Sequence, residues 1–429
     1  MTKSIQVALP SSSFKLSLLE TLHSLRPDIS RAMIADLMID ENAYYRDHKD
    51  VQRAGVPAVR HYFQYGEKEN RRYHYPRLAF SSKLAAETVK SGTTVFYTDA
   101  PDDNPSWLYR CVFPFKEDSI DSQAIFFSGV SLLSELLKAV FSAQKMVFMR
   151  PAYGPKTIYL IQLCRILGIK VEFDYDDLLL PEYARERGAC RSGLRTHQED
   201  FSESLKQSAL TVYADSITCS THLIAEELSK INPSVSVRPN KLPIKFFRTT
   251  QQVVSRAKTH KFTDNKIRIL YLSGSNTHKR DFSTITGPLT KLGQDLPNKF
   301  SISFMGSLSD YSKVFSVMGV ESRMISTTSF DKMLEVILSH DLVLVPLENS
   351  TFNNCKSNIK YLESASQGIP VIASGVHEFK SIISHGVNGW LCENESEWYN
   401  TLHEIITNPE ITITCGINAY KQAKQGLSV

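Results

Sequence analysis

The stretch KSNIKYLESASQGIPVIAS, residues 356–374, decides the fold. Apolar residues recur at helical spacing in its first half, and the run PVIAS at its end is typical of a buried strand. Gly368 and Pro370 separate the two, because glycine ends helices and proline does not continue them. The stretch therefore predicts a helix followed at once by a buried strand, which is the repeating unit of a parallel α/β sheet.

Strand and helix alternate through most of the rest of the chain. Short β-rich runs begin at residue 93, and segments with helical periodicity separate several of them. The expected strands of the first half lie in TTVFYTD (93–99), AIFFSGV (124–130), KMVFMRP (145–151), KVEFDYDD (170–177), SITCST (216–221) and VSVRPN (235–240). Those of the second half lie in IRILYLSG (267–274), SISFMGS (301–307), RMIST (323–327), DLVLVP (341–346) and PVIAS (370–374).

The pattern predicts two Rossmann-like domains that face a cleft, with an N-terminal helical extension. Residues 1–90 show no strand series and are expected to form helices as an accessory segment. We expect the first Rossmann-like domain at 91–250 and the second at 251–429. The polar segment 245–265 has little pattern and suits a linker. This architecture alone supports several functions.

Composition narrows the class of protein. A net charge of +4 over 429 residues does not indicate a nucleic-acid partner. Seven scattered cysteines, with no CxxC pair, predict reduced thiols in a cytoplasmic protein without a zinc or disulfide framework. No apolar run reaches the roughly 18 residues of a membrane span. The basic and aromatic segment 71–77 is either a solvated helical face or a surface patch that contacts an acidic acceptor or anionic lipid, the latter at the inner face of the membrane.

Two strand ends in the second half carry polar sequences, and open α/β sheets bind ligands beyond the carboxyl ends of their strands. The first reads GSNTHKRD and follows the strand expected at 267–274. Its small residues let backbone N–H groups approach a phosphate, and its basic residues supply cations for a diphosphate. A basic residue after a turn is also often simply solvated. The candidate donor contacts here are Gly274, Ser275, His278, Lys279 and Arg280.

The second polar strand end is NNCKSNIKYLE, residues 353–363. Its two leading asparagines are N-cap candidates, which would put Lys356 and Ser357 in the first helical turn, where an anion is favoured. We expect Lys356, Lys360 and Glu363 to share one face, with the carboxylate placed for ribose hydroxyls. The alternative is an ordinary charged helix face. The candidate contacts here are Lys356, Ser357, Asn358, Lys360 and Glu363.

KSNIKYLESASQGIPVIAS, with GSNTHKRDF upstream, resembles the C-terminal half of the family 4, retaining GT-B glycosyltransferases that build bacterial surface polysaccharides. The resemblance implies a GT-B fold and a nucleotide-sugar site in the second domain. By position, Lys279 would hold the diphosphate and Glu363 the ribose. The family often has a glutamate eight residues before the ribose glutamate, where this chain has Cys355. The role of that glutamate therefore does not carry over.

The resemblance extends more loosely to the first half, where it implies an acceptor domain. The acceptor-side candidates at strand ends are Asp99, Arg150, Asp174, Asp176 and Asp177. These aspartates could bind acceptor hydroxyls, hold a metal, transfer a proton or cap the following segment. We predict no metal, because cations and helix dipoles elsewhere can stabilise the leaving phosphate. Asp174 joins Lys279 and Lys356 as a catalytic candidate.

The resemblance implies transfer of a hexosyl or deoxyhexosyl group, with retention, from a UDP-, GDP- or dTDP-sugar to a saccharide or lipid-linked acceptor. The product would be a capsule, O-antigen or similar glycan, and no cofactor is required. Three alternatives stay open: an inactive binding partner in a glycosyltransferase complex, a GT-B sugar-nucleotide epimerase, and an inverting or CMP-sugar enzyme. The base, the sugar, the acceptor and the linkage are not identified.

Overall fold

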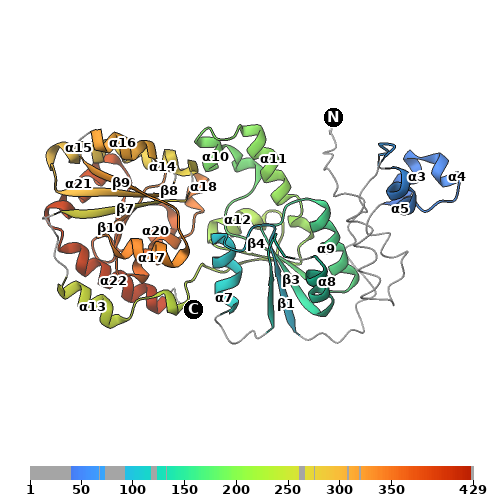
Figure 1. Ribbon diagram of the computed structural model, residues 1–429, viewed down its shortest axis with the longest axis horizontal. Helices are drawn as coiled ribbons and strands as arrows, with labels where there is room; N and C mark the ends of the chain where they lie inside the picture. Colours follow the sequence, from blue (N-terminus) through green and yellow to red (C-terminus); the bar gives the residue numbers. More distant parts are fainter. Residues whose placement is uncertain are drawn as a thin grey trace. The chain divides into compact units, whose positions relative to one another are not determined.

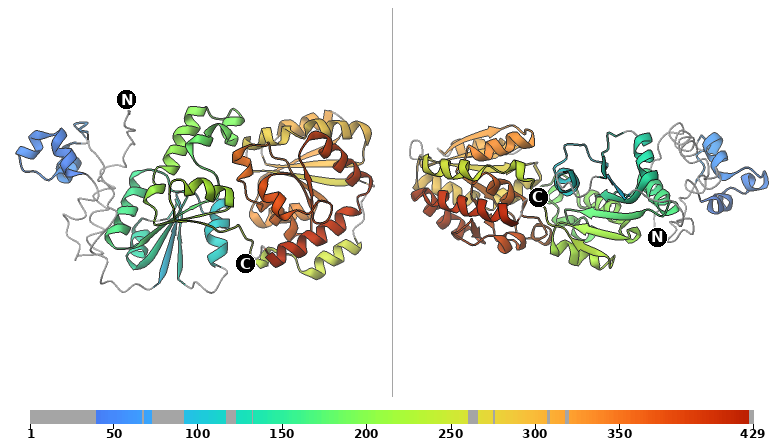
Figure 2. Two further views of the ribbon diagram at one scale, coloured as in Figure 1. Left: turned by 180° about the vertical axis from the view of Figure 1, so that it is seen from behind. Right: turned by 90° about the horizontal axis from the view of Figure 1, so that it is seen from below.

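The computed structural model describes most of the chain. The described residues are 40–66, 68–72, 92–116, 123–131, 133–259, 266–274, 276–306, 309–317 and 320–426. The helices predicted before residue 40, most of the 71–77 segment and the candidate Ser275 lie outside them. The chain divides into two compact units (Figures 1 and 2). Unit 1 comprises Met1–Trp107, Asp121–Asp174 and Lys206–Ile217, and unit 2 comprises Leu108–Ile120, Tyr175–Leu205 and Thr218–Val429.

The described part of the N-terminal segment is helical, as predicted. It contains α3 (Glu41–Asp47), α4 (Lys49–Arg53), α5 (Ala58–His61) and the π-helical turn η1 (Tyr62–Gly66). Asp40 caps α3 by accepting a hydrogen bond from the backbone N–H of Ala43 at 2.9 Å. Tyr44 is fully buried and donates to, or accepts from, His61 Nδ1 at 3.0 Å. These contacts give the segment a small core of its own.

The first sheet has six strands in the order β2-β1-β3-β4-β5-β6. They are β1 (Thr93–Tyr97), β2 (Ala124–Phe127), β3 (Ala143–Met149), β4 (Lys170–Tyr175), β5 (Ser216–Cys219) and β6 (Val235–Val237). The helices α8 (Leu133–Ser142), α9 (Pro155–Ile166) and α12 (His222–Ser229) lie between strands in the sequence, as the periodicity predicted. β1 pairs in parallel with both β2 and β3, so the crossover pattern is that of a Rossmann-like sheet.

The second sheet repeats this architecture in the order β12-β11-β10-β7-β8-β9. Its strands are β7 (Ile267–Ser273), β8 (Phe300–Gly306), β9 (Glu321–Ile325), β10 (Leu342–Val345), β11 (Val371–Ser374) and β12 (Trp390–Cys392). All five strands predicted for the second half are present. β12 was not predicted, because its three residues are too short to show a period. The prediction of two Rossmann-like α/β sheets is therefore confirmed.

Helices cover both faces of the second sheet (Figure 1). One face packs on α14 (Lys279–Ser283), α15 (Thr286–Asp295), α16 (Ser309–Val317) and α21 (Glu395–Thr407). The other packs on α13 (Thr250–Thr259), α17 (Phe330–Leu338), α19 (Ile359–Ser366), α20 (His377–Ile382) and α22 (Ile411–Gly426). Because both faces are covered, β10 and β11 are continuous apolar runs, as parallel sheets require.

The expected linker at 245–265 is in part a helix. α13 packs along α22, and its Val253 is buried against the turn at Gly368. The segment carries only a short apolar stripe in a polar sequence, so its pattern was too weak to indicate a helix. In the part of the chain that the structure describes, no helix is long and apolar enough to cross a membrane.

Candidate donor site

The two polar sequences singled out above follow neighbouring strands of the second sheet. β7 and β10 pair in parallel, with Ile269 opposite Leu342, so their carboxyl ends meet at the same edge. After β7 the chain passes through Gly274 and the turn η8 (Asn276–His278) into α14. After β10 it passes through α18 (Thr351–Asn354) into α19. The expected helix start after the glycine-rich turn is confirmed.

The expected helix start at residue 356 is wrong. Ser350 caps α18 by accepting from the N–H of Asn353, so the asparagines lie inside this short helix. Lys356 and Ser357 lie in the turn between α18 and α19, whose N-cap residue is Asn358. The sequence did not show that Ser350 starts a separate turn of helix. Consequently only Lys360 and Glu363 share the face of α19.

Glu363 is buried, with 3% of its surface exposed, and both of its carboxylate oxygens have partners. Tyr109 donates to Oε1 at 2.6 Å, and Lys360 Nζ lies 3.0 Å from Oε2. Burial and the adjacent carboxylate raise the pKa of Tyr109 well above its ordinary value, so the phenol stays protonated and donates. The ribose role of Glu363 stays a prediction, and the structure adds Tyr109 beside it.

Sequence reasoning missed Tyr109. It lies on the π-helical turn η3 (Leu108–Val112), which belongs to unit 2, and its ring packs edge-on against Phe113 and Phe330. Its partner Glu363 lies 254 positions further along the chain. Because no local pattern marks a contact at that separation, only the folded chain reveals it.

Sequence reasoning also missed Asp281, whose carboxylate contacts more groups than any other side chain discussed at this site. Its side chain is 1% exposed and accepts hydrogen bonds from Asn353 Nδ2 at 2.9 Å and from the N–H of Glu348 at 3.1 Å. His278 Nδ1 lies 3.0 Å from Oδ2, and Arg191 Nη2 lies 3.1 Å from Oδ1. Burial alone would raise the pKa of Asp281, but the His278 hydrogen bond and the Arg191 charge outweigh it and lower the pKa to about 2. This carboxylate therefore fixes the loops after β7 and β10 to each other.

The predicted cations of the first loop differ in their surroundings. Lys279 and Arg280 are both exposed. Arg280 pairs with Glu348 at 3.1 Å, and Glu348 also accepts a short charged hydrogen bond from Arg191. The turn of His278 packs on α10 (Gly188–Arg191), where a side chain at Gly188 would meet the carbonyl of Thr277 at 2.8 Å. Gly274 is exposed and has open space around its Cα.

Lys356, a predicted donor-site residue, forms an ion pair with Asp177, a predicted acceptor-side residue. Its Nζ lies 2.9 Å from Asp177 Oδ1 and 4.5 Å from the centre of the Phe352 ring. The adjacent Ser357 accepts a hydrogen bond from Asn240 Nδ2 at 2.9 Å. Both charges of the pair are about a quarter exposed, so the pair is accessible to a ligand.

Cys355 occupies the position at which the resembled family often has a glutamate. It is buried, and burial raises the pKa of its thiol to about 12. Its carbonyl accepts a hydrogen bond from Thr221 at 3.1 Å. The thiol is therefore neutral at physiological pH and supplies no carboxylate to a sugar.

The remaining acceptor-side candidates lie at strand ends of the first sheet. Asp99 follows β1, accepts a short hydrogen bond from Tyr97 and lies 3.7 Å from Lys156 Nζ. Arg150 follows β3 in the left-handed region, with φ of +48°, and its N–H donates to the carbonyl of Asp174 at 2.9 Å. Asp174 is fully buried. Its neighbour Asp176 accepts a hydrogen bond from Ser220 at its carbonyl. Among the described residues, no three His, Cys, Asp or Glu side chains could hold a metal ion.

Comparisons with known proteins bear on this architecture. Residues 289–408 match the family model described as Glycosyl transferases group 1. No curated protein matches the chain. A crystal structure of HepE from Anabaena in complex with UDP-glucose matches with a TM-score of 0.53 and 14% identity, over 78% of this chain and 95% of that one. The chain has the GT-B fold.

Two further solved structures have the same degree of likeness to this chain. Sucrose-phosphate synthase from Thermosynechococcus elongatus matches with a TM-score of 0.51 and 15% identity, over 79% of this chain and 85% of that one. WaaG, a glycosyltransferase involved in lipopolysaccharide biosynthesis, matches with a TM-score of 0.51 and 12% identity, over 77% of this chain and 95% of that one. In the present GT-B chain the matched segment 289–408 includes Glu348, Lys356 and Glu363.

Proposed function

We propose that this chain is a glycosyltransferase that transfers a sugar from a nucleotide-sugar to a saccharide or lipid-linked acceptor in surface polysaccharide synthesis. The observation that carries the proposal is the match of residues 289–408 to the group 1 glycosyltransferase model, within a GT-B fold. That segment contains the two helices and the turn on which Lys356 and Glu363 lie. The structures of HepE with UDP-glucose and of WaaG support the same class of reaction.

The donor diphosphate would bind between Lys279 and the turn at Lys356. The side chain of the N-cap residue Asn358 makes no capping hydrogen bond, so it does not occupy the first N–H groups of α19. Backbone donors of this kind, together with Lys279 and Arg280, suit a diphosphate. In this proposal Gly274 and Ser357 allow close approach of the backbone on either side.

The ribose would bind to Glu363. A carboxylate has about four acceptor positions, and Tyr109 and Lys360 fill one on each oxygen. In this proposal the two ribose hydroxyls would take the second acceptor position on each oxygen of this buried carboxylate. Tyr109 and Lys360 would then hold the carboxylate in a fixed orientation, which lowers the ordering cost of binding.

The proposed chemistry needs charge stabilisation more than a nucleophile. The diphosphate leaves with developing negative charge, and preorganised cations at Lys279 and Lys356 would stabilise it. The acceptor hydroxyl would attack the anomeric carbon from the face that the diphosphate leaves: the new glycosidic bond forms, the bond to the diphosphate oxygen breaks, and the hydroxyl proton passes to the leaving diphosphate, which would retain the anomeric configuration. The acceptor-side candidates stay Asp99, Arg150, Asp174, Asp176 and Asp177.

A donor screen tests the proposal. Binding and hydrolysis would be measured for UDP-, GDP-, dTDP- and CMP-sugars on the wild type and on the variants Lys279→Ala and Glu363→Ala. One donor should bind, and both variants should weaken it at least tenfold, while Lys170→Ala at an exposed end of the first sheet should not. If no nucleotide-sugar binds, the proposal fails.

The neutral thiol at Cys355 favours one second candidate, a nucleotide-sugar-binding partner without activity of its own. A donor that binds in the screen but is neither hydrolysed nor transferred to any acceptor would support it. Measurable turnover by the purified chain would exclude it.

A further inference from the structure

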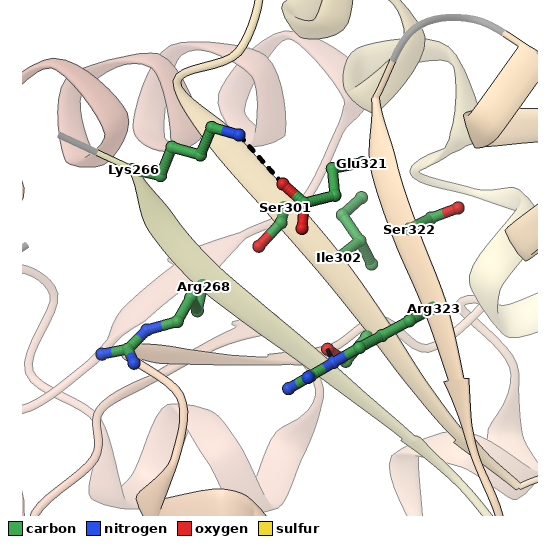
Figure 3. A pocket seen from close by; sticks show the side chains of 8 residues that line it. Lys266, Arg268, Ser301, Ile302, Glu321, Ser322 and Arg323 are labelled. Atoms are coloured by element: carbon green, nitrogen blue, oxygen red, sulfur yellow. Dashed lines mark hydrogen bonds and ion pairs between the residues drawn. The ribbon is translucent and has the colours of Figure 1, made fainter. Parts of the chain in front are cut away.

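The second sheet has a polar hollow at the amino ends of β7, β8 and β9, at the opposite end of these strands from the candidate donor site (Figure 3). Its volume is about 180 Å³. The lining residues are Lys266, Arg268, Ser301, Ile302, Ser303, Glu321, Ser322 and Arg323. They come from three adjacent strands, so the sheet itself forms the floor of the hollow.

Alternation along the strands explains why the hollow is polar. Lys266 and Arg268 flank Ile267, which is buried in the core on the other face. Ser301 lies opposite Glu321, and Ser303 lies opposite Arg323. The serine side chains are too small to fill the space between the longer charged side chains, which leaves room for a ligand.

Most charges around the hollow are paired. Lys266 Nζ lies 2.9 Å from Glu321, and Arg268 makes two contacts of 3.0 and 3.1 Å with Asp341. Arg323 differs, because its Nε donates to Ser303 Oγ at 2.9 Å and no carboxylate among the described residues pairs with it. The hollow therefore carries one positive charge that no acidic residue of the described chain neutralises.

A buried relay holds Arg323 in place. His340 is fully buried, and its Nδ1 lies 2.7 Å from the Val336 carbonyl, which can only accept, so Nδ1 carries the proton. Nε2 then accepts from the hydroxyl of Ser303 at 2.8 Å, which leaves Ser303 Oγ to accept from Arg323 Nε. This chain of bonds fixes the guanidinium through one nitrogen. The two terminal nitrogens are left for a ligand.

We propose that this hollow is a second ligand site, which binds the phosphate group of a phosphate monoester. The fork of an arginine matches phosphate oxygens, and the hydroxyl of Ser301 and the ammonium of Lys266 approach from the other strands, whereas the Ser322 hydroxyl donates to the Ser312 carbonyl of α16 on the opposite face. Donors from three strands surround a volume, which suits a tetrahedral anion better than a planar carboxylate. The phosphate could belong to a free metabolite or to a lipid headgroup. The inference is independent of the proposed transferase activity.

Thermal unfolding of the full chain tests the site, with inorganic phosphate as the probe at constant ionic strength set by chloride. Phosphate should raise the melting temperature with a saturable dependence, because a ligand that binds the folded state stabilises it. Arg323→Gln should weaken the apparent affinity at least tenfold, and Arg323→Lys should weaken it less. Arg53→Gln, which removes one charge from an exposed helix end, is the matched control and should change nothing.

Two comparisons separate this site from the donor site and identify the source of the phosphate. Lys279→Ala should keep the phosphate response if the hollow is responsible and lose it if the donor site is. Sedimentation with phosphatidylcholine vesicles, with and without phosphatidic acid, tests the lipid source, and Arg323→Gln should abolish any dependence on phosphatidic acid. The proposal is overturned if neither phosphate nor phosphatidic acid gives a response. It is also overturned if both responses are the same in Arg323→Gln as in the wild type.

Discussion

Replacing Asp281 by asparagine should destabilise the second sheet domain more than any exposed charge substitution. The carboxylate receives four donors, from His278, Arg191, Asn353 and the N–H of Glu348. An asparagine keeps one acceptor oxygen but turns an NH₂ group toward groups that are themselves donors. The variant therefore leaves buried donors without acceptors and removes the charge that neutralises Arg191.

Two routes give the size of this effect. The pKa of Asp281 falls from 3.8 to about 2 on folding, which corresponds to about 2.5 kcal/mol of stability at about 1.4 kcal/mol per unit. Removing one partner of a buried ion pair typically costs about 3–5 kcal/mol. We therefore expect a loss of about 3 kcal/mol. For a domain of this size, that lowers the melting temperature by roughly 6–12 °C.

Fluorescence-detected thermal unfolding suits this test, because Trp390 and Trp398 are both buried in the second sheet domain. Asp331→Asn, at an exposed position of the same domain, is the matched control and should change stability by less than about 1 kcal/mol. For a domain of this size, a change of about 1 kcal/mol in stability shifts the melting temperature by roughly 2–3 °C. If Asp281→Asn melts within that interval of the control, Asp281 does not fix the two loops.

The other predictions concern single groups. Tyr109→Phe should lower the free energy of unfolding by about 1.5–3 kcal/mol, because it removes a buried hydrogen bond to the charged Glu363. Urea unfolding measures this loss, and an unchanged free energy would show that the bond is absent in solution. Burial lowers the pKa of His340 to about 4, below its unfolded value of 6.5, so on acidification the unfolded state binds a proton at a higher pH than the folded state does. The free energy of unfolding should therefore fall as the pH is lowered from 6.5 to 4. In His340→Gln, unfolding curves measured at several pH values should show a smaller fall. A thiol reagent at pH 8 should modify Cys190 in the folded chain and spare the six buried thiols, and rapid modification of more than one thiol would contradict their burial.

Most of the fold was readable from the sequence because strands buried on both faces are continuous apolar runs. β10 (LVLV) and β11 (VIAS) are bounded by proline, glycine or charged residues, so their extent is plain. β12, with three residues, has no detectable period. α13 was hidden because tertiary packing of Val253, and not helix propensity, stabilises it.

The candidate site was readable only in part. Lys279, Lys356 and Glu363 stood out because they follow predicted strand ends, and their roles remain predictions. The start of α19 was misplaced, since the capping bond that decides it joins Ser350 to Asn353 within an earlier, separate turn. Tyr109, Arg191 and Asp281 could not be assigned, because their importance comes from partners 254, 90 and 72 positions away.

Hydrogen–deuterium exchange with and without the best nucleotide-sugar is the sharpest test of the proposed donor site. That site lies at the carboxyl ends of β7 and β10, so the ligand should slow backbone exchange in residues 276–281 and 356–363. Exchange at the amino ends of the same strands, around residues 266–268 and 321–323, should not change. Protection confined to those amino ends, or absent from both 276–281 and 356–363 at saturating ligand, would contradict the donor site proposed here.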